Sequence, residues 1–275
     1  MAELYKHSGA VTLTGTLMGL VAGGVAAVAL AFVYTYAVVW IPFIYVNFLL
    51  TLIFGVGVGF AVAAGAKAGK LRNMAVAGLL GAFCGLLGLY VAWAIHPMAQ
   101  FSLTPEFDPS KLMEYMGAVY EKGTWGISRS GPVSGILLGI IWAVEAGIIV
   151  LGAALVPPGR LGDLAFCEPC DVWTRVQTGV RTISLAGVDP ILARIGEGDV
   201  AALRETKPSD AADAGYVRVD LSTCPNCANS AYLTLTLVQK KVDEKGKEST
   251  EEKAVLQNLV LAAADVGIVK EPAPR

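Results

Sequence analysis

Residues 132–156 read PVSGILLGIIWAVEAGIIVLGAALV, and this stretch decides the fold of the chain. Its 25 residues carry a single charge, on Glu145 near the middle. A helix rises about 1.5 Å per residue, so the stretch can cross the roughly 30 Å hydrocarbon layer of a membrane. Pro157-Pro158-Gly159 follows it and is expected to end the helix. The stretch therefore predicts a transmembrane helix that joins an apolar half of the chain to a polar half.

Three further uncharged stretches precede this helix, at residues 11–40, 42–66 and 73–95. The first is longer than the apolar core of a secretory signal peptide, which is about 7–15 residues, so we expect it to stay as a span. Pro42 suits the first turn of the second helix. Residues 1–156 are therefore predicted to form a membrane α-helical bundle of four transmembrane helices.

The composition separates this half from the rest of the chain. Of the 275 residues, 55% are hydrophobic and only 16% are charged, whereas soluble domains are about a quarter charged. Residues 157–275 hold 14 Lys and Arg and 17 Asp and Glu, a net charge of 14 − 17 = −3. This polar region is predicted to be a second domain, and its acidity excludes the basic surface that nucleic-acid partners require.

The basic residues of the membrane half predict its orientation. Lys67, Lys70 and Arg72 lie in the loop between the second and third spans, which has no acidic residue. Short loops rich in Lys and Arg face the cytoplasm, so both termini and residues 157–275 are expected on the cytoplasmic side of the plasma membrane. On the other side, Asp108-Pro109 predicts a short amphipathic helix. It would lie on the outer surface or fold back over the bundle.

Glycines recur four residues apart in all four predicted spans. The series are Gly15/Gly19/Gly23, Gly55/Gly59, Gly81/Gly85 and Gly131/Gly135/Gly139. Small residues at this spacing let helix backbones approach closely where lipid removes the hydrophobic drive for association. Packing within one bundle and contacts in a homo-oligomer both explain the pattern.

The polar domain is predicted to mix strands with short helices. The strands cover residues 172–185, 216–221, 231–242 and 254–262, and short helices begin at Asp189 and Asp199. The last strand is ambiguous, because Ser249 and Glu252 have the spacing of a helix-starting capping box. A turn at 243–247 favours a strand that returns along 231–242, so a small α+β domain is expected.

Four cysteines in two CxxC pairs give the strongest chemical signal. The pairs are Cys167/Cys170 and Cys224/Cys227, and residues 171–223 separate them. Each CxxC turn presents two thiolates to one ion, and two turns complete a tetrahedral four-sulfur site. Such a site usually holds zinc (Zn²⁺) in a closed, structural arrangement. The separation is long for a compact ribbon, so the helices between the pairs are read as an insertion.

The sequence Cys224-Pro225-Asn226-Cys227 resembles the Cys-Pro-x-Cys knuckle of the zinc-ribbon superfamily and of rubredoxins. The resemblance covers about residues 164–262 and implies a zinc-ribbon scaffold rather than an activity. Asp171 and Ala228 stand where these knuckles usually have a glycine after the second cysteine. This departure concerns the tightness of each turn and leaves the ligand set unchanged.

Two other interpretations of the cysteine pairs stay open. A four-sulfur site also suits a rubredoxin-like iron centre, and a CxxC pair with a lowered thiol pKa can exchange disulfides. A membrane-bound thiol or rubredoxin-like redox protein would follow from either. Lasting disulfides are rare in the cytoplasm, which favours a bound metal. Cys84, alone in the third span, is expected to be a small buried apolar residue.

Glu145 is the candidate functional residue of the membrane half. A carboxylate at the centre of a span is costly and marks a functional site by default. In a structural role, Glu145 would donate a hydrogen bond to a carbonyl or to a hydroxyl such as that of Thr51. Its other role would be a proton or cation site in a small transporter or channel. His7 and His96 are expected to be solvated rather than catalytic.

These observations favour a non-enzymatic protein. No Ser/His/Asp set, phosphate loop or carboxylate pair is visible in the sequence. We expect an integral membrane protein in the lipid bilayer whose zinc-ribbon tail acts as a protein-binding adaptor or assembly subunit. The transporter or channel that uses Glu145 is the alternative.

Overall fold

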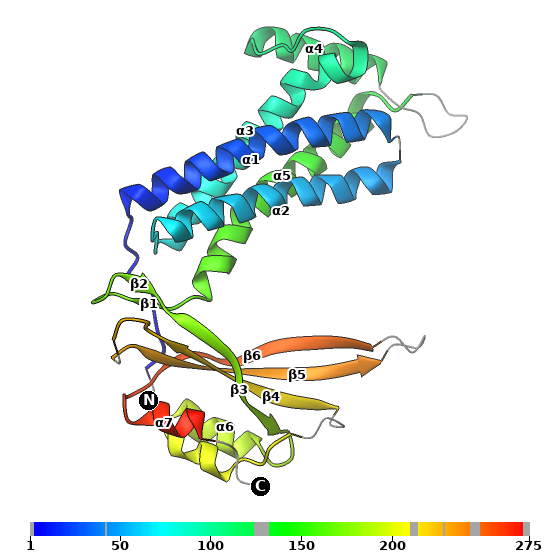
Figure 1. Cartoon of the computed structure of the whole chain (residues 1–275). Helices are drawn as coiled ribbons and strands as arrows, with labels where there is room; N and C mark the ends of the chain where they lie inside the picture. Colours follow the sequence, from blue (N-terminus) through cyan, green and yellow to red (C-terminus); the bar gives the residue numbers. More distant parts are fainter. Residues whose placement is uncertain are drawn as a thin grey trace. The chain divides into compact units, whose positions relative to one another are not determined.

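The computed structural model describes residues 3–41, 43–123, 132–209, 214–227, 229–242 and 248–271 (Figure 1). The chain forms two compact units, one from Ser8–Gly162 and one from Met1–His7 together with Asp163–Arg275. Pro42, Gly131 and the predicted turn at 243–247 lie outside the described residues.

Four helices of the first unit are long and apolar enough to cross a membrane, which confirms the four predicted apolar helices. They are α1 (Leu13–Trp40), α2 (Ile44–Ala68), α3 (Met74–Phe101) and α5 (Gly135–Gly162). Side chains cap two of them where the sequence offers an acceptor. The Thr12 hydroxyl accepts from the Gly15 N–H at the start of α1, and the Asn73 side-chain oxygen accepts from the Val76 N–H at the start of α3.

The four helices form a bundle in which α1 and α5 each pack against both α2 and α3 (Figure 1). Its core contains small and large apolar side chains, among them Ala27, Phe54, Val62 and Ile149. Cys84 lies fully buried in this core, as predicted. The outer side chains are also apolar, and Ile136 is 77% exposed. A bilayer covers an exterior of this kind.

Several of the predicted glycines are points of close approach between helices of this one chain. A Cβ added to Gly81 of α3 would lie 2.0 Å from the Ala153 carbonyl oxygen of α5, and one added to Gly55 of α2 would lie 2.6 Å from the Ile149 carbonyl oxygen. Only glycine allows these backbones to meet. Packing within one bundle therefore accounts for these positions, whereas a Cβ at Gly135 would meet nothing.

The prediction that Pro157-Pro158-Gly159 end the last span is wrong, because α5 continues to Gly162. A proline within a helix leaves the carbonyl four residues earlier without its N–H donor. Those carbonyls belong to Ala153 and Ala154, and both face glycines of α3, at Gly81 and Gly78. Neighbouring helices can re-satisfy such groups, in part through weak Cα–H donors, so the helix continues through the two prolines.

The predicted amphipathic helix is present as α4 (Pro109–Lys122). The Asp108 carboxylate accepts from the N–H groups of Ser110 and Lys111, and Pro109 begins the first turn. Leu112 and Val119 are buried. Tyr120 approaches Trp142 of α5, with ring centroids 6.4 Å apart. Of the two predicted positions, α4 therefore takes the one folded back over the end of the bundle.

The second unit contains a four-stranded antiparallel sheet with strand order β3-β4-β5-β6 and a small hairpin, β1-β2. The strands are β1 (Phe166–Cys167), β2 (Val172–Trp173), β3 (Arg175–Ser184), β4 (Gly215–Thr223), β5 (Ala231–Val242) and β6 (Glu248–Val260). The predicted strands are confirmed, including the ambiguous last one. Ser249 and Glu252 pair with Lys241 and Val238 across the β5-β6 ladder.

Three short helical segments complete the core of this unit on one face of the sheet (Figure 1). They are α6 (Asp189–Gly196), η2 (Val200–Glu205) and α7 (Asp265–Lys270). Ile195, Leu203 and Val269 from these segments are buried with Leu221 and Leu233 from the sheet. The first two segments match the predicted helices, while α7 was not predicted.

The N-terminal segment belongs to the sheet unit rather than to the helical bundle. Leu4 forms an antiparallel bridge with Leu259, the Tyr5 N–H donates to the Asn258 carbonyl, and the Val260 N–H donates to the Glu3 carbonyl. The sequence alone assigned residues 1–7 to the membrane half because they directly precede the first span. Backbone pairing across more than 250 positions could not be seen from local pattern.

Candidate metal centre and membrane cavity

The first cysteine pair lies on the β1-β2 hairpin. Cys167 ends β1 and pairs with Val172 in the hairpin register. The Asp171 N–H donates to the Glu168 carbonyl at 3.2 Å. Asp171 has a φ of 51°, in the left-handed region that usually takes glycine. Aspartate is one of the few other residues that adopt this conformation readily, so the turn closes without the glycine that the sequence lacks.

The second pair lies on the loop between β4 and β5. The Cys224 N–H donates to the Ser230 carbonyl at 2.9 Å, which closes the loop at its base. Inside the loop, the Asn226 N–H points to the Cys224 sulfur at 3.4 Å. The two flanking strands fix the loop because they pair from Gly215↔Gln239 to Thr223↔Ala231 without a shift.

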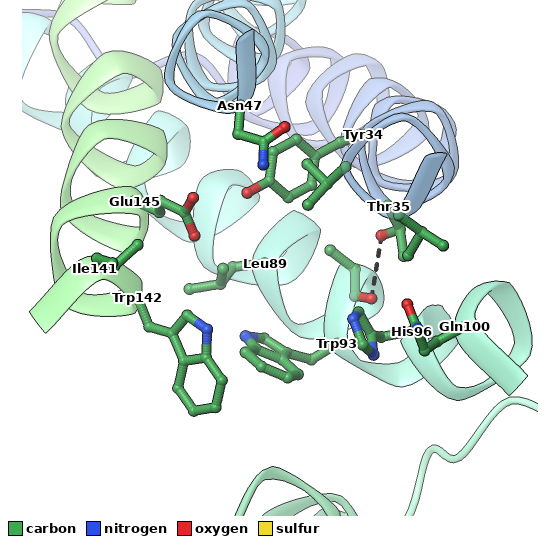
Figure 2. A pocket seen from close by; sticks show the side chains of 13 residues that line it. Tyr34, Thr35, Asn47, Leu89, Trp93, His96, Gln100, Ile141, Trp142 and Glu145 are labelled. Atoms are coloured by element: carbon green, nitrogen blue, oxygen red, sulfur yellow. Dashed lines mark hydrogen bonds between the residues drawn. The ribbon is translucent and has the colours of Figure 1, made fainter. Parts of the chain in front are cut away.

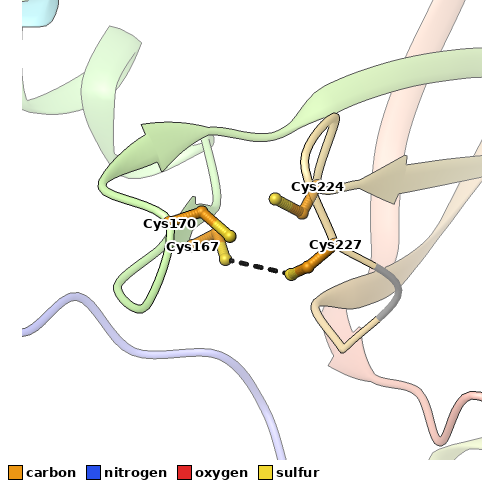
Figure 3. Close-up of side chains that lie close together, drawn as sticks. All are labelled: Cys167, Cys170, Cys224 and Cys227. Carbon is orange, nitrogen blue, oxygen red and sulfur yellow. Dashed lines mark hydrogen bonds between the residues drawn. The ribbon is translucent and has the colours of Figure 1, made fainter.

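The two loops face one another and bring the four predicted cysteines together (Figure 3). All four sulfur atoms lie within 4.8 Å of one another. The sulfurs of Cys167 and Cys227 are 3.7 Å apart, well beyond the roughly 2.05 Å of a disulfide bond. The cysteines are free thiols. Four sulfurs converging on one point can hold a metal ion, as the sequence predicted.

Hydrogen bonds shift the pKa values of the cysteine thiols in opposite directions. The Ser230 hydroxyl donates to the Cys167 sulfur at 3.1 Å. The Asn229 backbone lowers the pKa of Cys227 to about 7, while a hydrogen bond with Cys227 raises the pKa of Cys170 to about 12. The Cys227 thiol therefore loses its proton more readily than the Cys170 thiol. Sequence reasoning missed Ser230, because a serine three residues after a cysteine is not by itself a signal.

Glu145 lines a cavity of about 160 Å³ in the helical bundle (Figure 2). The walls come from all four long helices and include Tyr34, Trp93 and Trp142. The Tyr34 hydroxyl points toward the Glu145 carboxylate (Figure 2) and is close enough to interact with it electrostatically. Within the described part of the chain, no hydrogen bond or ion pair holds this carboxylate.

The suggested partner Thr51 is not available to Glu145. Its hydroxyl donates to the Asn47 carbonyl at 2.8 Å and lies 3.4 Å from the Tyr34 hydroxyl. Asn47 is itself a residue that sequence reasoning missed. It is only 6% exposed, and its side-chain oxygen has no hydrogen-bond donor among the described residues. A buried acceptor without a donor costs about 1–3 kcal/mol, so Asn47 needs an explanation.

Both histidines are half-buried rather than solvated. The Nδ1 atom of His96 lies 2.7 Å from the Tyr115 hydroxyl of α4. His7, in the other unit, packs edge-on against Tyr5 with ring centroids 5.1 Å apart. His96 lines the same cavity as Glu145, but its described hydrogen bond is with Tyr115 rather than with the carboxylate.

No protein-family model matches this chain, and neither a curated protein nor a solved structure gives a significant match.

Proposed function

We propose that this chain is a non-enzymatic integral membrane protein whose sheet unit binds zinc through Cys167, Cys170, Cys224 and Cys227 and acts as a protein-binding adaptor. The single observation that carries the proposal is the convergence of four sulfurs, from two loops, to within 4.8 Å. Zinc with Zn–S bonds of about 2.3 Å would place tetrahedral sulfurs about 3.8 Å apart. The separation of 3.7 Å between Cys167 and Cys227 fits this value.

A closed four-sulfur site has a structural role. All four tetrahedral positions are taken by protein, so a zinc ion held there has no open position for substrate. It would instead join the β1-β2 hairpin to the β4-β5 loop. A rubredoxin-like iron centre uses the same donor set, and elemental analysis separates the two metals.

Replacing Cys224 with serine should therefore release the metal and unfold the sheet unit. Zinc binding supplies folding free energy to small domains of this kind, whereas the helical bundle does not depend on it. We expect one zinc per chain in the wild type by elemental analysis, less than a tenth of that in Cys224→Ser, and rapid proteolysis of residues 163–271 in the variant alone. Cys84→Ala, which changes the remaining cysteine, should keep one zinc. Stoichiometric iron would contradict the zinc assignment.

The adaptor role is supported by an edge of the sheet. The N-terminal segment pairs with β6 only near Asn258 and Val260. The preceding part of β6 has no strand on its outer side among the described residues. An open edge can accept a strand from another protein, with affinity supplied by backbone hydrogen bonds.

A photo-crosslinking residue at the exposed position Thr250 of β6 should capture one protein from native membranes at about a 1:1 ratio. The same residue at Lys111 of α4 is the matched control and should capture none. Capture at Thr250 should also be lost in Cys224→Ser, because the edge depends on the folded unit. Equal capture from both positions, or capture that survives Cys224→Ser, would refute the adaptor.

The proposal places both termini and the cysteine unit in the cytoplasm, on the basis of Lys67, Lys70 and Arg72. Single cysteines Ser110→Cys and Ser249→Cys, introduced in a background without other cysteines, test this orientation. A membrane-impermeant thiol reagent on intact cells should label Ser110→Cys alone. The reverse pattern would invert the topology. Lysed cells, in which both positions react, give the control for accessibility.

A second candidate function, a small proton or cation transporter or channel, is favoured by one observation. The Glu145 carboxylate faces a cavity and makes no hydrogen bond or ion pair with the described residues. Glu145→Gln keeps the shape of the side chain but cannot titrate. If the candidate is correct, liposomes with the wild type will show proton or cation flux, and the flux with the variant will be at least tenfold lower. Exposed Glu114 on α4 gives the matched control, Glu114→Gln. If the wild type shows no flux, the transport candidate is refuted and the adaptor role remains as the proposed function.

A further inference from the structure

The cavity beside Glu145 has the size of a small organic molecule. Its volume of about 160 Å³ is close to the roughly 150 Å³ of engineered cavities that bind benzene. It exceeds by several fold the roughly 30 Å³ that one water occupies in the liquid. The occupant can therefore have about five or six non-hydrogen atoms.

The unpaired polar groups of the cavity favour a ligand that donates hydrogen bonds. The side-chain oxygen of Asn47, in a residue only 6% exposed, has no donor among the described residues. The Glu145 carboxylate offers further acceptors, and the described lining contains no Lys or Arg to neutralise it. The Thr35 hydroxyl is already bonded to the Ala92 carbonyl.

Two of the remaining lining residues favour positive charge. Trp93 and Trp142 meet edge to face with ring centroids 4.7 Å apart, and both line the cavity (Figure 2). Tyrosine and tryptophan rings attract cations through their negative faces. A hard metal cation would instead favour several carboxylate ligands, and among the described lining residues Glu145 is the one carboxylate.

We propose that this cavity binds a primary ammonium group whose N–H bonds point to the Asn47 side-chain oxygen and the Glu145 carboxylate. The indoles of Trp93 and Trp142 flank its charge. Binding is independent of the cysteine unit. The proposed site rests on the cavity of the transport candidate but does not require transport. If the protein binds the amine without moving it across the membrane, the binding remains and only the flux is absent.

Calorimetric titration of the full chain in detergent with n-butylammonium tests the site. The wild type should give saturable heat, with tetramethylammonium and 1-butanol binding at least tenfold more weakly, since the first lacks N–H donors and the second lacks charge. Glu145→Gln should weaken n-butylammonium at least tenfold. Glu114→Gln should leave it unchanged.

Asn47→Leu removes only the neutral acceptor and so separates its contribution to binding from that of the Glu145 carboxylate. It should weaken n-butylammonium and leave tetramethylammonium unchanged, because the latter makes no hydrogen bond to Asn47. Saturable heat absent from the wild type, or n-butylammonium affinity equal in the wild type and Glu145→Gln, would overturn the proposal and leave a cavity filled with water only. The conservative glutamine keeps this test valid even if Asn47→Leu fails to fold.

The ammonium group can belong to a free amine or to the ethanolamine headgroup of a lipid, and nanodiscs distinguish these sources. If the lipid is the natural occupant, n-butylammonium will bind more weakly in discs that contain phosphatidylethanolamine than in discs of phosphatidylcholine alone. Equal affinity in both discs assigns the site to a free amine.

Discussion

The convergence of four sulfurs is the interaction that links the β1-β2 hairpin to the four-stranded sheet. Cys167 and Cys170 sit on a hairpin with two-residue strands, and such a hairpin has little stability of its own. Cys224 and Cys227 sit on a loop held by the long β4-β5 ladder. An ion shared by the two loops would transfer the rigidity of the sheet to the hairpin. The insertion that carries α6 and η2 is closed at both ends by this link.

The N-terminal segment makes a second set of contacts with the β1-β2 hairpin and the neighbouring sheet. Tyr5 accepts a hydrogen bond from the Phe166 N–H, next to Cys167, and packs edge to face on Tyr232 with ring centroids 5.0 Å apart. A segment that precedes the first apolar helix thus supports the loop that carries the first cysteine. Removing it would expose Tyr232 and leave the end of β6 unpaired.

In the membrane that we propose for it, the helical bundle obeys a different constraint, which is that its backbone groups must be satisfied without water. Pro157 and Pro158 release the carbonyls of Ala153 and Ala154, and glycines of α3 meet both of them. This requirement leaves polar groups in the bundle rare and usually paired. Asn47 and Glu145 depart from that rule inside one cavity, and such departures are expected at functional sites rather than in packing cores.

The sequence alone determined most of the elements and the donor set. Runs without charge specify the long helices, period-two alternation specifies β4 and β5, and CxxC spacing specifies the four sulfurs, because each of these signals is local. Tertiary structure decided what local signals cannot contain. The prolines of α5 continue a helix because glycines of another helix lie opposite, and Asp171 closes a turn that lacks glycine. The cavity exists because Asn47 and Glu145, nearly a hundred residues apart, face one space between packed helices.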